Sequence, residues 1–233
     1  MKPDYFAEDQ MVPASVISDE ALKSILKEGE YVIDDGWDIG CQVIEKRIIK
    51  HPFYKNTNQI DLKMVLPFEE GTVIGSWLAV DFGRNSPKDG PSLFRLHGKS
   101  PPIHEINAKL PISLDDDDTA ARYLRFFCAH VWGDAGGFWV VSDIEDIPFV
   151  STEARAEAAA DLQTIAAPKF KGRNSEGHFL FSAHIMHGSA IFEGEFEVVE
   201  SGMVNMIDDR LVAKNIRRIE DERISGFRLF KTP

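Results

Sequence analysis

Residues 179–206 read FLFSAHIMHGSAIFEGEFEVVESGMVNM, and apolar side chains recur there at every second position. This alternation predicts two half-buried antiparallel strands joined by a two-residue hairpin turn at Gly188-Ser189. The pairs predicted on the apolar face are Ile185–Phe192, Ala183–Gly194, Phe181–Phe196 and Phe179–Val198. The pairs predicted on the other face are His184–Glu193, Ser182–Glu195 and Leu180–Glu197. A slip of one residue would move the apolar side chains from the buried face to the solvent face, so the pattern specifies this register.

The pattern continues beyond this hairpin toward the C-terminus. Glu200-Ser201-Gly202 fits a three-residue loop with Gly202 in the left-handed position. This loop pairs Val198 with Val204 and Phe196 with Met206 on the apolar face. Asp208-Asp209 then suits a turn into a fourth strand, in which Leu211 and Ala213 continue that face. Residues 178–219 are therefore predicted to form a four-stranded antiparallel meander with one apolar side.

Helices are predicted before the meander. The run Asp115–Asp118 precedes a helix over 119–132, because acidic residues favour a helix start and a broad apolar stripe follows. Ser151 or Thr152 caps a second helix to about residue 166, whose stripe of small residues suits it to cover the apolar side of the meander. Elements predicted earlier in the chain are a short helix within 18–29 and strands over 40–50, 59–66 and 72–82.

The predicted fold class is α+β, with a mainly antiparallel sheet packed against two or three helices. The order of helix, strand, helix and four strands resembles cystatin-like and nuclear-transport-factor-like domains over about half of the chain. That resemblance implies a sheet curled like a cone around a helix. We predict a loose N-terminal arm over 1–17 and a single domain over 18–233. The alternative is a strand-rich first half over 18–112 and a second half over 113–233.

Composition excludes several classes of protein. The 233 residues include 38 acidic and 26 basic side chains, a net charge of −12, which disfavours binding to nucleic acid. Two cysteines are too few for a disulfide scaffold or a four-cysteine zinc site. No apolar run approaches the about 18 residues of a membrane span. We therefore expect a soluble, cytoplasmic protein of bacterial type that binds neither nucleic acid nor membrane.

The candidate catalytic residues are His184 and Glu193. The predicted register places them opposite each other, so Glu193 could orient His184 as a general base if that face lined a pocket. A solvated charge pair on an exposed sheet face explains the same pattern. The sequence contains no phosphate-binding loop, dinucleotide fingerprint, nucleophile elbow or zincin helix.

Candidate ligand-binding residues are His130, Trp132 and Trp139. The two tryptophans flank a glycine-rich turn and would form either an aromatic recognition patch or part of the core. Cys128 is expected to be a core residue.

No metal site or cofactor is expected. His184 and His187 are three residues apart on a strand and point to opposite faces. The acids at 115–118 are explained by the helix start and lack the spacing of a calcium loop.

The function predicted first is a non-catalytic binding or protein-interaction domain, whose partner is a second copy of the chain or another protein. The alternative is a small-molecule-binding domain or cofactor-free enzyme with a pocket between helix and sheet. A metal-dependent hydrolase using His184 and His187, or the acidic run, is the third hypothesis.

Overall fold

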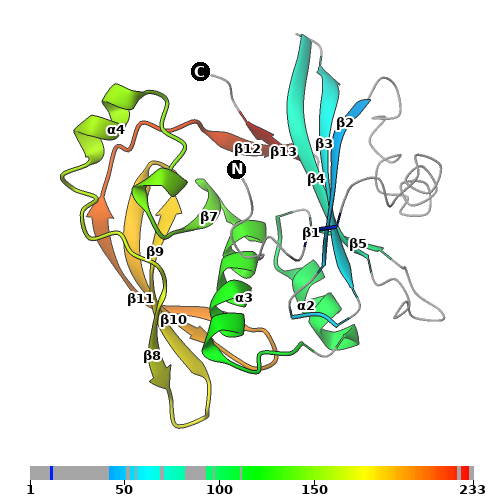
Figure 1. The fold of residues 1–233 in the computed structure, drawn as a ribbon, viewed down its shortest axis with the longest axis vertical. Coiled ribbons are helices and arrows are strands. Elements are labelled where there is room, and N and C mark those ends of the chain that lie inside the picture. Colours follow the sequence, from blue (N-terminus) through cyan, green and yellow to red (C-terminus); the bar gives the residue numbers. More distant parts are fainter. Residues whose placement is uncertain are drawn as a thin grey trace. The chain divides into compact units, whose positions relative to one another are not determined.

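The computed structural model describes residues 11–12, 42–50, 53–55, 57–68, 71–81, 93–96, 98–110, 112–224 and 227–230 (Figure 1). They fall into two compact units. One unit contains residues 112–222, and the other contains the described residues up to 110 together with 223–230. The division into independently folding domains stays a prediction, as does the arm over 1–17. The predicted helix within 18–29 lies outside the described residues.

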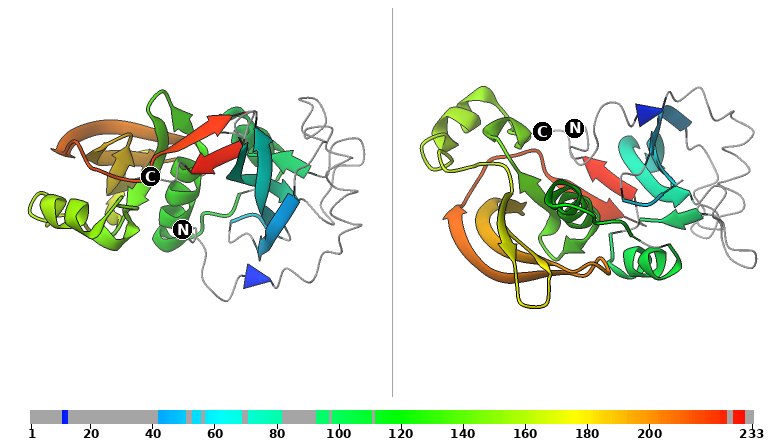
Figure 2. Two further views of the ribbon diagram at one scale, coloured as in Figure 1. Left: turned by 90° about the horizontal axis from the view of Figure 1, so that it is seen from above. Right: turned by 60° about the horizontal axis from the view of Figure 1, so that its bottom comes forward.

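The unit over 112–222 is built on a six-stranded antiparallel sheet. Its strands are β6 (Trp132–Gly133), β7 (Gly136–Val141), β8 (Lys169–Arg173), β9 (Phe179–His187), β10 (Ala190–Val198) and β11 (Val204–Ala213). They run in the order β11-β10-β9-β7-β6, with β8 also paired to β9. Figures 1 and 2 show the sheet curled into a half-barrel, which confirms the predicted α+β fold.

The predicted register of β9 and β10 is confirmed at every pair. Phe181 lies opposite Phe196, and His184 lies opposite Glu193. The next turn is also as predicted, because Val198 pairs with Val204 and Gly202 has a φ of 83°. Glycine adopts this left-handed conformation without the steric cost that other residues pay.

The predicted turn at Asp208-Asp209 and the fourth strand are wrong. A single strand, β11, runs through these residues, with irregularities opposite Phe196 and beside Phe192. Bulges of this kind absorb extra residues without ending the strand. Asp208 and Asp209 are exposed, so their carboxylates reach water from within a strand and need no turn.

Helix α3 (Asp117–His130) packs against β7 and β9. Asp116 caps it by accepting a hydrogen bond from the Thr119 amide at 2.7 Å. The buried hydroxyl of Tyr123 donates to the Gly202 carbonyl at 2.8 Å, which ties the helix to the β10–β11 turn. The apolar face of β9 is almost fully buried, through Phe179, Phe181, Ala183 and Ile185.

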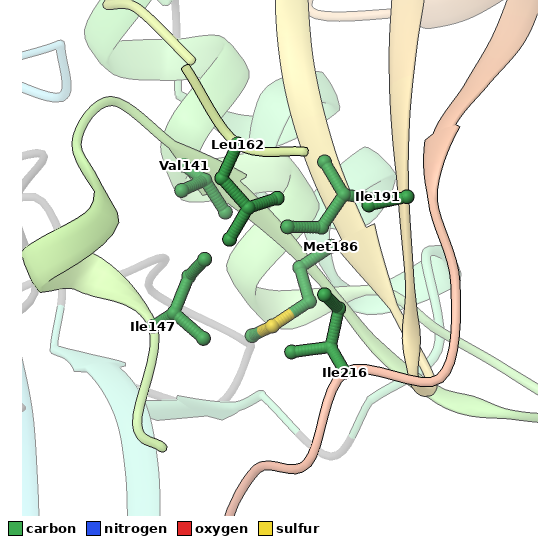
Figure 3. Packing of buried hydrophobic residues seen from close by; sticks show 7 residues of the cluster. Val141, Ile147, Leu162, Met186, Ile191 and Ile216 are labelled. Carbon is green, nitrogen blue, oxygen red and sulfur yellow. The ribbon is translucent and has the colours of Figure 1, made fainter. Parts of the chain in front are cut away.

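Helix α4 (Thr152–Ala158) is shorter than the predicted helix over 152–166. Ser151, one of the two predicted caps, caps its start. Turns with hydrogen bonds between residues three apart follow the helix. These turns place Leu162 in a cluster on the face of β9 that carries Met186 (Figure 3). The cluster comprises Val141, Ile147, Leu162, Met186, Ile191, Ala213 and Ile216. The expectation that this segment covers the Phe181 face is therefore wrong, because the sheet is covered on both faces at this end.

The second sheet has seven strands in the order β1-β2-β3-β4-β13-β12, with β5 paired to β4, and its last strand β12 begins at the end of the first unit. The pairs β1–β2, β2–β3, β3–β4, β4–β5 and β4–β13 are antiparallel. Its strands are β1 (Met11–Val12), β2 (Gln42–Lys50), β3 (Asn58–Phe68), β4 (Gly71–Asp81), β5 (Leu93–Arg95), β12 (Asp221–Ile224) and β13 (Phe227–Phe230). β2, β3 and β4 correspond to the three predicted strands. Helix α2 (Pro101–Lys109) was not predicted, because Pro101-Pro102 reads as a loop although proline also suits the first helical turn.

Truncation of the apolar face tests this fold. Phe181→Ala and Phe196→Ala should each lower the free energy of unfolding by ~3–5 kcal/mol, because both rings are buried. Phe170→Ala on β8 is the matched control, since that ring is 37% exposed and should cost clearly less. Urea unfolding measures all three. Equal losses at the three positions would contradict the assignment of the buried face.

Candidate functional site

His184 lies on β9 between the neighbouring strands β7 and β10, opposite Val141 and Glu193. The side chain is buried, with 7% of the residue exposed. Its Nδ1 accepts a hydrogen bond from the Ala166 amide at 3.4 Å. The segment after α4 therefore holds this imidazole with Nδ1 unprotonated, and a neutral ring carries its proton on Nε2.

Glu193 is held by two other side chains. Arg210 Nη2 on β11 donates to one carboxylate oxygen at 2.5 Å, and Ser182 Oγ donates to the other at 3.3 Å. The hydrogen bond from Arg210 lowers the pKa of Glu193, and the positive charge of Arg210 and the hydrogen bond from Ser182 lower it further. Within the described part of the chain, His184 is hydrogen-bonded to Ala166, whereas Glu193 is hydrogen-bonded to Arg210 and Ser182. The roles of general base and orienter therefore stay predictions.

A second imidazole–carboxylate pair lies on the same face, and the sequence analysis missed it. His178 Nδ1 is 2.9 Å from Glu197 Oε1. Asn174 donates to the same oxygen at 2.7 Å, and Asn205 donates to Oε2 at 2.9 Å. These hydrogen bonds, led by the one from His178, lower the pKa of Glu197. The predicted register contained a signal for this pair. It places Phe179 opposite Val198, so His178 and Glu197 lie next to that pair and on the same face of the sheet.

The local turn explains how Asn174 reaches this pair. Its side-chain oxygen accepts hydrogen bonds from the amides of Glu176 and His178, each at 3.0 Å. The turn between β8 and β9 therefore fixes both the asparagine and the histidine. Because Glu197 accepts from Nδ1, a neutral His178 ring presents Nε2 as an acceptor. Such a carboxylate-oriented imidazole is suited to hydrogen bonding or proton transfer.

The three predicted ligand-binding residues lie in different environments. His130 is 2% exposed at the end of α3, and its Nδ1 lies 2.6 Å from the Phe126 carbonyl. Trp132 on β6 and Trp139 on β7 are half-buried. Their indole nitrogens both lie beside Gly137, at 3.2 and 3.3 Å from the place a Cβ would occupy. The structure thus brings the two tryptophans together, and Trp139 also packs against the Met186 cluster.

The histidine and the acidic residues of the metal hypothesis make other contacts in the structure. His187 stacks on Phe138 with ring centroids 4.2 Å apart. At the start of α3, the capping hydrogen bond lowers the pKa of Asp116, and Asp118 pairs with Arg122 at 2.9 Å. Burial raises the pKa of the Cys128 thiol to about 12. In the described ranges no group of three or more His, Cys, Asp or Glu residues is arranged to hold a metal ion.

An exposed apolar surface lies on β11, which the sequence analysis expected to be buried. Met206, Ile207 and Leu211 are 51%, 58% and 49% exposed, and we call these three residues the β11 strip. β10 is the one sheet neighbour of β11 within the described part of the chain. The expectation that Met206 and Leu211 extend the buried face is therefore wrong, because about half of each residue stays exposed while α3 packs mainly on β7 and β9.

Comparison with known proteins adds no relative, since no protein-family model, no curated protein and no solved structure matches this chain. None of the helices in the described residues is long and apolar enough to cross a membrane.

The hydrogen-bonded carboxylates predict a pH dependence of stability. The pKa of Glu197 is lower in the folded chain than in the unfolded one, so its contribution is complete above the unfolded value of about 4.3. That contribution is lost as the pH falls through the folded value. Glu197→Gln should therefore show a smaller loss of unfolding free energy on acidification, as measured by urea denaturation at neutral and acidic pH.

Glu195→Gln is the control for this experiment, because Glu195 is an exposed acid on the same face between Glu193 and Glu197. It should leave the pH dependence of the parent protein unchanged. An identical pH dependence in the parent and in Glu197→Gln would show that the His178–Glu197 pair is not formed in solution.

Proposed function

We propose that this chain is a non-catalytic binding domain of the protein-interaction class, and that the β11 strip is its contact surface. The observation that carries the proposal is the exposure of three large apolar side chains on one edge strand. Methionine and other large apolar residues are typical of the centre of protein interfaces, and exposed apolar patches mark binding sites.

The backbone of β11 supports the same proposal. An edge strand has main-chain groups that a partner strand can pair with, and many proteins bind extended segments in this way. Every residue from Asn205 to Leu211 is exposed, so neither face of this stretch is covered. By contrast Trp132 and Trp139, the contact residues first predicted, are half-buried, and Trp139 contributes to the core.

Small-molecule binding on the polar face is the second candidate function. It is supported by the 2.9 Å pairing of His178 with Glu197, which orients an imidazole next to Asn174 and Asn205. Native mass spectrometry of the purified chain discriminates between the two candidates. An excess mass that His178→Ala removes would favour a small-molecule site, whereas a bare chain would contradict it.

A site-specific photocrosslinker tests the protein-interaction proposal. A benzophenone side chain at position 207 should crosslink a protein in cells, because the parent isoleucine is 58% exposed. The captured protein is then purified and titrated against the parent chain and against Ile207→Lys. We expect Ile207→Lys to weaken binding by at least about tenfold, since it would put a charge into an apolar contact.

Phe170→Lys is the matched control, because Phe170 is an exposed apolar residue on the other side of β9. It should leave the affinity unchanged once its folding is verified by circular dichroism. If no protein crosslinks from position 207, or if both variants bind like the parent, the β11 strip is not the contact surface.

A further inference from the structure

We propose that the partner of the β11 strip is a second copy of this chain, which pairs antiparallel with β11 about a two-fold axis at Asp209. The inference rests on the proposed function of the strip as a protein contact surface. It adds the identity of the partner and the register of the contact.

The shape of β11 restricts where a second strand can pair. The stretch Asp208–Leu211 is regular and lies opposite 192–195 of β10, between the two irregularities of the strand. Ile207 has no partner on β10 and is the extra residue of the first irregularity. Bulges twist and disrupt an edge, so regular pairing is favoured over Asp208–Leu211 and ends at Ile207. Asp209 lies near the middle of this segment, and its partner on β10 is Gly194, which has no side chain.

When two copies of β11 lie antiparallel, the side chains on either side of Asp209 in one copy complement those in the other copy. With the axis at Asp209, Ile207 of each copy lies opposite Leu211 of the other copy. Asp208 of each copy likewise lies opposite Arg210 of the other. All of these side chains are exposed in the single chain. Apolar and opposite-charge pairs at directly opposed positions both stabilise an antiparallel sheet, and a two-fold axis makes each pair occur twice.

Neighbouring registers lack this complementarity. A two-fold axis normal to the sheet keeps every side chain on its own face, so the axis must pass through a pair of identical residues. With the axis at Asp208, the two Asp208 carboxylates oppose each other and Ile207 lies opposite Asp209 twice. With the axis at Arg210, the two Arg210 side chains oppose each other and Asp209 lies opposite Leu211 twice. Like charges in direct opposition are destabilising, as is an apolar side chain held against a charge. The charged residues of β11 therefore favour one register over its neighbours.

Three features keep this association weak. The two Asp209 carboxylates oppose each other at the axis, and Arg210 also binds Glu193 of its own chain at 2.5 Å. A single pair of strands also buries less surface than the about 1,200 Å² at the lower end of stable interfaces. We therefore expect a reversible dimer with an affinity in the micromolar range, near 1 μM or weaker. Asp209→Asn should tighten it by removing the like-charge pair.

Charge reversal tests the partner and the register together, with sedimentation velocity over a range of concentrations as the measurement. The parent chain should dimerise as its concentration rises. Asp208→Arg opposes two arginines twice and Arg210→Asp opposes two aspartates twice, so each variant alone should be monomeric. An equimolar mixture of the two variants should dimerise, because the arginine introduced in one variant would then face the aspartate introduced in the other.

Lys169→Asp is the control, because it reverses an exposed charge on β8 rather than β11 and should associate like the parent. A parent chain that stays monomeric overturns this inference. The proposed function still stands in that case if a different protein crosslinks from position 207. Dimers that survive both single charge reversals overturn the register, and dimers that also survive Ile207→Lys overturn the strip as a contact surface.

Discussion

The register between β9 and β10 is the constraint on which the unit over 112–222 depends. Side chains alternate between the two faces of a strand, so one register assigns every residue of the hairpin to a face. Phe181 and Phe196 then bury together, and the ring of Phe196 covers Gly194, where a Cβ would lie 2.6 Å from it. The apolar surface formed in this way provides the face that α3 packs against through β7 and β9.

The opposite face of the hairpin has two environments. Near the β9–β10 turn it is apolar, and Met186 and Ile191 pack under Leu162 (Figure 3). Farther along the strands it is polar, and carboxylates accept hydrogen bonds from histidine, asparagine and arginine side chains. His184 lies between the two, buried but hydrogen-bonded to a backbone amide. The same strand pair thus supports both a core and a polar surface.

The edge strand β11 contains both apolar residues that favour association and charged residues that oppose it. Exposed apolar residues on β11 favour contact with another chain, while Asp208, Asp209 and Arg210 disfavour pairing in most registers. Charged residues and bulges are common means of preventing uncontrolled association of edge strands. In the dimer that we propose they leave one self-complementary register, so an edge that resists aggregation would still pair with a second copy of the chain.

Local patterns were sufficient for the elements whose signals depend on neighbours in the chain. They predicted the β9–β10 register, the left-handed Gly202, a helix start at the run Asp115–Asp118, a cap of α4 at Ser151 or Thr152, and the cross-strand position of Glu193 opposite His184. They did not reveal that β11 continues through Asp208, that α4 covers the Met186 face, or that Glu193 binds Arg210 and His178 binds Glu197. Those features depend on which segments meet in space and which faces water reaches. An alternating pattern assigns residues to faces, but tertiary packing decides whether a given face is covered.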